Sequence, residues 1–144
     1  MIGIRHLALS SALVLGLGIT MNAPAQDEEA PTPLQEAMGT LMGGMRQLRP
    51  LVADPAANQE TIVEVLHGMQ AAVLSAIQNP PEPPTGFPEG GVFTWRNNYQ
   101  RKMLELADAL FEAELGAHRG KADEIGAALG KANEIKKVGH DVWK

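Results

Sequence analysis

The stretch LQEAMGTLMGGMRQL, residues 34–48, decides the fold because its large apolar side chains recur at helical spacing. The recurring positions alternate steps of four and three residues: Leu34, Met38, Leu41, Met45 and Leu48. This spacing places side chains on one face of an α-helix that packs in a bundle. Thr32, Pro33 and Gln35 suit an N-cap, a first helical position and a capping box, so the sequence predicts a helix start there.

Pro50 and Pro55 end or bend this first helix. The same apolar pattern recurs three times in the rest of the chain. We predict helices over roughly 58–78, 93–117 and 122–143, with Asn58 as an N-cap and Gly120 as a stop signal. Their apolar positions are Ile62, Leu66, Met69, Val73 and Ile77; Tyr99, Met103, Leu106 and Leu110, with Leu115 nearby; and Ile125, Leu129, Ala132, Ile135 and Val142. Five prolines exclude a helix over 79–91, and no segment alternates like a strand. The expected fold class is all-α, a single antiparallel up-down-up-down four-helix bundle.

Residues 1–25 have the features of a secretory signal peptide. Arg5 precedes an apolar stretch from Leu7 to Ile19, and Ala23-Pro24-Ala25 fits a cleavage site. An uncleaved anchor is the alternative, although the apolar stretch is short for a span of about 20 residues. We therefore expect export to the periplasm, a disordered lead-in over residues 26–33 and a bundle domain over residues 34–144.

Composition excludes several kinds of function. The chain has no Cys, which rules out zinc–thiolate sites, iron–sulfur clusters, thioether-linked haem and Cys nucleophiles. Loss of residues 1–25 leaves 11 basic and 17 acidic residues, and this net charge of −6 argues against nucleic acid or anionic lipid as a partner. No Ser-His-Asp arrangement, phosphate loop or paired-carboxylate site can be argued, so we do not expect an enzyme.

Met38 and His140 are the residues that carry chemistry in this arrangement. The predicted topology brings the start of the first helix and the end of the fourth to one end of the bundle, on neighbouring helices. The same end should collect five of the six aromatic residues: Phe87, Phe93, Trp95, Tyr99 and Trp143. A thioether and an imidazole in an apolar, aromatic-lined slot suit the two axial positions of a haem iron.

Each of these residues also has a simpler interpretation. A Met in an apolar seam is usually core packing, and a His near a helix C-terminus is often a surface group. Helix geometry puts His140 within about 20° of Leu129, at the edge of the apolar face. Met38, Met42 and Met45 form a thioether stripe that soft Cu(I) could use, although core packing is the commoner role. His67 and His118 are expected on the surface and at the opposite end, respectively.

Short motifs along the chain resemble those of a known family. They are LQEAM at 34–38, MQAA at 69–72, the Pro-rich middle loop, ADAL at 107–110, Gly120-Lys121 and His140 near the C-terminus. On these motifs, residues 34–144 resemble the soluble periplasmic cytochrome b562 family. In that family a Met early in the first helix and a His late in the fourth hold haem b, and these positions match Met38 and His140.

The resemblance implies a periplasmic electron-transfer protein that binds one non-covalent haem b per chain through Met38 and His140. Two positions depart from the family pattern: Lys136 stands where an Arg is usual, and Gly139 where an aromatic is common. We expect a monomer with no nucleic acid partner and no membrane association after signal cleavage; the redox partner protein is unknown. The alternative is a haem-free exported bundle that acts as a binding or stress-response protein.

Overall fold

The computed structural model describes residues 30–143, which fold into four α-helices. These are α1 (Pro33–Leu51), α2 (Gln59–Gln78), α3 (Val92–His118) and α4 (Ala122–Val142), with a short 3₁₀ helix, η1 (Glu89–Gly91), before α3. The all-α four-helix fold is confirmed; α1 begins at the predicted Pro33, and α2, α3 and α4 begin and end within one residue of their predicted bounds. The predicted signal peptide lies outside the described residues. None of the helices within 30–143 has the length and hydropathy that a membrane span requires.

Two predicted helix caps have different outcomes. Thr32 and Gln35 form the expected capping box, with the Thr32 hydroxyl accepting from the Gln35 N–H at 3.2 Å and the Gln35 side chain accepting from the Thr32 N–H at 2.8 Å. Asn58 occupies the predicted N-cap position of α2, but its side chain makes no cap hydrogen bond to that helix. It donates instead to the carbonyl oxygens of Asp54 at 2.8 Å and Leu51 at 3.4 Å, so it closes the α1–α2 loop.

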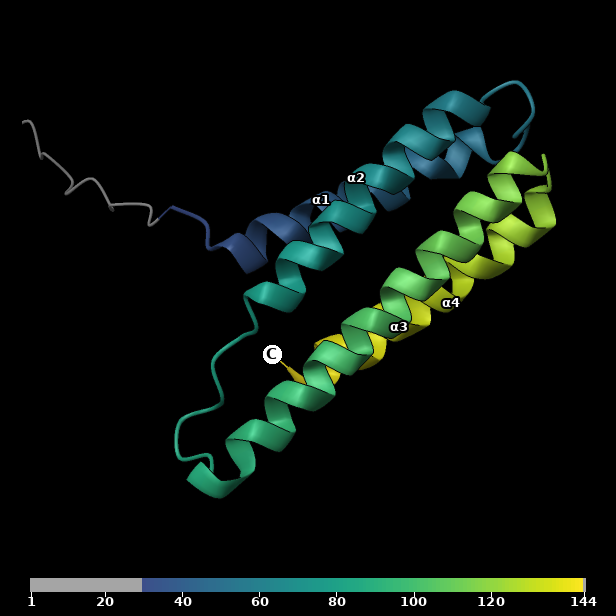
Figure 1. The fold of residues 1–144 in the computed structure, drawn as a ribbon. Helices are drawn as coiled ribbons and strands as arrows, with labels where there is room; N and C mark the ends of the chain where they lie inside the picture. The colour runs from purple at the N-terminus through teal and green to yellow at the C-terminus, as the bar shows by residue number, and fades with distance from the viewer. Residues whose placement is uncertain (1–29, 144) are drawn as a thin grey trace, which may run out of the picture.

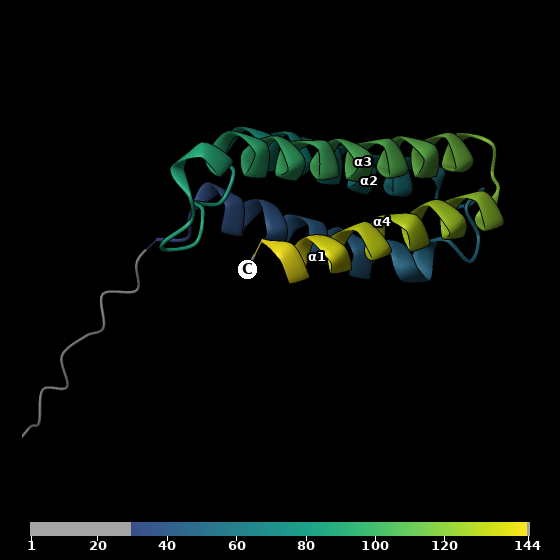
Figure 2. The ribbon, with the colours of Figure 1, turned by 90° about the horizontal axis from the view of Figure 1, so that it is seen from below.

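The four helices pack in chain order. The α1–α2 pair lies beside the α3–α4 pair, with the long middle connection at one end (Figure 1, Figure 2). Buried apolar side chains from all four helices form the core, chiefly Leu41, Leu48, Ile62, Leu66, Met69, Val73, Met103, Leu106, Leu110, Ile125 and Ile135. Helix α1 packs on α2, α2 on α3 and α3 on α4, whereas α1 and α4 make little direct contact within the described residues. We call this loosest side of the bundle the α1–α4 seam.

Two apolar residues that the sequence pattern placed near the core are exposed. Leu115 is 49% exposed because α3 meets α4 at Gly116, where a Cβ would lie 3.0 Å from the backbone nitrogen of Ile125. This close approach turns Leu115 outward. Val142 is 54% exposed, since Trp143 packs against the core at the end of α4 in its place.

Candidate functional site

An apolar cavity of about 120 Å³ lies in the α1–α4 seam, at the end that holds the start of α1 and the end of α4. Both residues singled out from the sequence line it: Met38 is half-buried and His140 is exposed. The remaining lining residues are Leu34, Pro81, Tyr99, Met103, Leu106, Lys136, Gly139 and Trp143. The fold therefore brings a thioether and an imidazole from two facing helices to one apolar space.

The seam continues inward from this cavity. A second hollow of about 10 Å³ lies between Met45 of α1 and Ala132 of α4, and it shares Leu106 and Lys136 with the first. Met69 of α2 also lines it. The two spaces thus follow the α1–α4 seam, where the helices are packed least closely.

Tyr99 forms a rigid, neutral part of the cavity wall. Its ring is buried, with 4% of the residue exposed, and its hydroxyl donates to the carbonyl oxygen of Ala76 at 3.2 Å. Burial raises the pKa of Tyr99 to about 12 because the phenolate would lose its hydration. The phenol is therefore uncharged at physiological pH and fixes α3 against α2 beside the cavity.

Trp143 lines the cavity at the end of α4. Its ring meets Tyr99 edge-on, with centroids 5.7 Å apart and an interplanar angle of 75°. A Cβ on Gly139 would lie 3.9 Å from Trp143 Cε3, so the indole folds back over the preceding helical turn. Its Nε1–H is buried and has no acceptor among the described residues, a condition that costs about 1–3 kcal/mol.

The predicted cluster of five aromatic residues is only partly formed at the cavity. Tyr99 and Trp143 line it, whereas Phe87 and Trp95 pack on each other, with centroids 6.1 Å apart. Phe93 is 79% exposed, so its assignment to the slot was wrong. It precedes Tyr99 by six residues, which turns it about 120° away from the buried face of α3.

A polar network between α2 and α3 was not foreseen. The Glu114 carboxylate accepts a hydrogen bond from Gln70 Nε2 at 2.6 Å and lies 3.0 Å from His67 Nε2 and 3.7 Å from His118 Nε2. The hydrogen bond from Gln70 is the main reason that the pKa of Glu114 lies below its usual value; burial opposes this effect and His67 adds to it. The sequence signal for the network was Gln70, a polar residue beside the seam position Met69. His67 is exposed, as expected, and His118 ends α3 at the opposite end of the bundle, as expected.

No group of three or more His, Cys, Asp and Glu side chains suited to hold a metal ion occurs within residues 30–143. Met38 and His140 form a different kind of donor pair, a thioether with an imidazole. The network around Glu114 joins α2 to α3 through Gln70 and His67.

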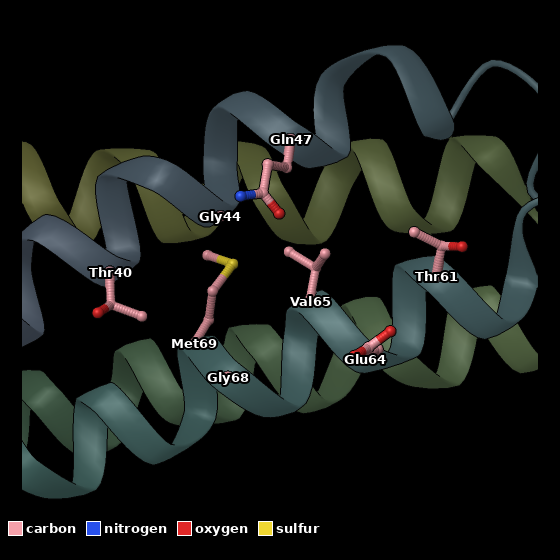
Figure 3. A pocket seen from close by; sticks show the side chains of 8 residues that line it. All are labelled: Thr40, Gly44, Gln47, Thr61, Glu64, Val65, Gly68 and Met69. Carbon is pink, nitrogen blue, oxygen red and sulfur yellow. The ribbon is translucent and has the colours of Figure 1, made fainter.

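A wider groove of about 360 Å³ lies between α1 and α2 (Figure 3). It is lined by Thr40, Gly44, Gln47, Thr61, Glu64, Val65, Gly68 and Met69, without a His or an aromatic ring. Its lining therefore lacks both an imidazole ligand and a stacking surface. The cavity at the α1–α4 seam is the better candidate for a binding site.

No protein-family model matches the chain, and no curated protein or solved structure is significantly similar to it. Membership of the cytochrome b562 family stays a sequence-based prediction. Because one fold serves many functions, a function for this chain has to be inferred from the residues that line the cavity.

The cavity offers donor atoms that suit a haem iron. The present volume of the cavity, however, is too small for the macrocycle. Met38 and His140 offer the thioether and imidazole that axial ligation uses, and apolar side chains supply most of the wall. Sites for ligands of drug size have volumes of about 300–1,000 Å³. At about 120 Å³, the cavity must widen before it can hold a macrocycle, and the loosely packed seam is where it can do so.

Proposed function

We propose that this chain is an exported, periplasmic electron-transfer protein that binds one non-covalent haem b in the α1–α4 seam, with Met38 and His140 as axial ligands. The observation that supports this most is that both side chains line one apolar cavity from facing helices. Bound haem would supply one-electron exchange between Fe(II) and Fe(III). The resemblance of residues 34–144 to the cytochrome b562 family supports the same function.

The chain's own residues would orient the group and exclude water. Met103 and Leu106 are buried on α3 and give the cavity an apolar floor. Lys136 is half-buried and lies one turn before His140. It would offer a positive charge to a carboxylate group of the bound ligand. If Met38 and His140 both held the iron, electron transfer would be favoured over reactions with oxygen or a substrate.

Haem titration of purified protein tests this function. The wild type should give a low-spin, six-coordinate spectrum, and Met38→Ala should lose the sixth ligand and lower the reduction potential. Met42→Ala is the matched control, because Met42 lies one turn further along α1, is 44% exposed and does not line the cavity. An unchanged spectrum in Met38→Ala would show that Met38 is not a ligand.

His140 needs its own comparison. His140→Ala should abolish the six-coordinate spectrum, whereas His118→Ala should keep it, since His118 ends α3 at the other end of the bundle. Loss of the spectrum in both variants, or in neither, would contradict the assignment of His140.

A haem-free exported bundle with a binding or stress-response role is the second candidate. The small volume of the cavity favours it. Protein purified from the periplasm should then show no Soret band. Haem that binds only the folded state should stabilise it by about 2.7 kcal/mol at a concentration one hundred times Kd. Equal thermal midpoints with and without saturating haem would favour this second candidate.

A further inference from the structure

The Trp143 side chain lines the cavity at the end of α4. Its indole packs on Tyr99 and folds back over Gly139, the residue before His140. Trp143 follows the last residue of α4, and its backbone N–H donates to the Gly139 carbonyl at 2.9 Å. The ring can therefore leave the cavity by rotation of its own side chain, with α4 intact.

One observation, a buried donor without a partner, indicates a second position for this ring, and the cavity volume sets what that movement would change. The cavity of about 120 Å³ is smaller than the roughly 300 Å³ at which sites for larger ligands begin. The indole Nε1–H is buried without an acceptor among the described residues, so movement of the ring into water would satisfy that donor. Departure of the ring exchanges its contact with Tyr99 for hydration of Nε1 and frees space beside Met38 and His140.

We propose that Trp143 is a gate that determines the size of ligand the cavity admits. With the indole in place, the cavity accepts a small apolar molecule such as benzene, which an apolar cavity of about 150 Å³ is known to bind. With the indole displaced, it accepts a flat polycyclic ligand. The identity of that larger ligand as haem rests on the proposed function, whereas the gate is a property of the chain itself.

Binding of benzene and naphthalene to the haem-free protein tests the gate, with Kd measured from chemical-shift changes at the cavity residues. Wild-type protein should bind benzene. It should bind naphthalene only weakly, because the free energy needed to displace the indole reduces the apparent affinity for naphthalene. Trp143→Ala should bind naphthalene about tenfold more tightly or better. Trp95→Ala is the matched control, since Trp95 packs on Phe87 and does not line the cavity. Should Trp143→Ala fail to fold, Trp143→Leu removes the ring and keeps an apolar side chain. Equal naphthalene affinities in the wild type and the Trp143 variant overturn the gate.

The rate of haem uptake separates the gate from the proposed function. Haem should associate about tenfold faster with Trp143→Ala than with the wild type or Trp95→Ala, because a required conformational step slows association. Tighter naphthalene binding by Trp143→Ala, with no Soret band in any variant, supports the gate and contradicts the haem function. A Soret band with identical naphthalene affinities and uptake rates contradicts the gate and leaves the haem function standing.

Discussion

Gly44 of α1 lies directly against the side chain of Met69 of α2, so close that a Cβ on Gly44 would overlap Met69 Cγ and Sδ (Figure 3). Met69 is 1% exposed and part of the core, so it has little freedom to move aside. The absence of a side chain at Gly44 therefore sets how closely α1 and α2 approach.

Alanine substitutions of two glycines in α1 should have opposite effects. Gly44→Ala should lower the free energy of unfolding by about 1–3 kcal/mol, because an added methyl group overpacks the contact with Met69. Gly39→Ala should raise it by about 0.5–1 kcal/mol, because its Cβ meets no atom within 4 Å and alanine favours helix. Urea unfolding measures both. Two changes of the same sign would contradict the tight contact.

Tyr99 should ionise about two pH units above an ordinary tyrosine. It is the only tyrosine in the chain, so near-ultraviolet absorbance reports its ionisation without interference from another. Burial raises the pKa from 10.0 to about 12 in the folded protein. Folding therefore gains stability from this residue below pH 10, and the gain is lost as the pH rises through the folded value. A midpoint near 10 in the folded protein would show that the ring is hydrated.

Glu114 should make stability sensitive to acid. The hydrogen bond from Gln70 lowers the pKa of Glu114 from its usual 4.5. The ionised Glu114 therefore contributes to the free energy of unfolding above pH 4.5, and this contribution is lost as the pH falls through the lowered pKa. Glu114→Gln should reduce the free energy of unfolding at neutral pH and flatten its dependence on acid. Glu112→Gln is the control, since Glu112 pairs with Lys131 in solvent, where ion pairs contribute little to stability. Identical acid profiles for wild type and Glu114→Gln would contradict this role.

Replacement of Lys136 and Gly139 together by cysteine should allow covalent capture of haem, if the proposed function is right. Both positions line the cavity with Met38, and they stand four and one residues before His140, as in a Cys-x-x-Cys-His attachment site. A Cβ on Gly139 makes only ordinary contact with Trp143. The variant, expressed in an exporting host with haem-maturation machinery, should keep its colour after acid-acetone extraction. Complete extraction of colour from a folded, haem-loaded variant would contradict this orientation of the group.

The helices could be predicted from sequence because their signals are local. The capping box of Thr32 and Gln35, the Pro-rich middle loop and Gly120 all act within a few residues of the chain. Periodicity likewise identified the buried face of each helix, including Ile62, Leu66 and Val73 of α2. The positions of Met38 and His140 at one end follow from that topology alone.

What the sequence could not supply depends on how the helices approach one another. Asn58 was a reasonable N-cap, but its side-chain amide donates to the carbonyl oxygens of Leu51, at the end of α1, and Asp54, and it makes no bond to α2. The bond between Gln70 and Glu114 joins residues 44 positions apart, and no local pattern encodes it. The volume of the cavity and the position of the Trp143 ring depend in the same way on the separation of α1 and α4.

The packing of each helix on the next one in the chain has a kinetic consequence. Contacts between α1 and α2, α2 and α3, and α3 and α4 close short loops, and such local topologies fold quickly. Contacts across the remaining side must join the two ends of the domain, which carries the largest loop-closure entropy. We expect that side to form after the folding transition state. A ligand held there should therefore slow unfolding and leave the folding rate nearly unchanged, and substitutions there can alter ligand chemistry without delaying assembly of the bundle.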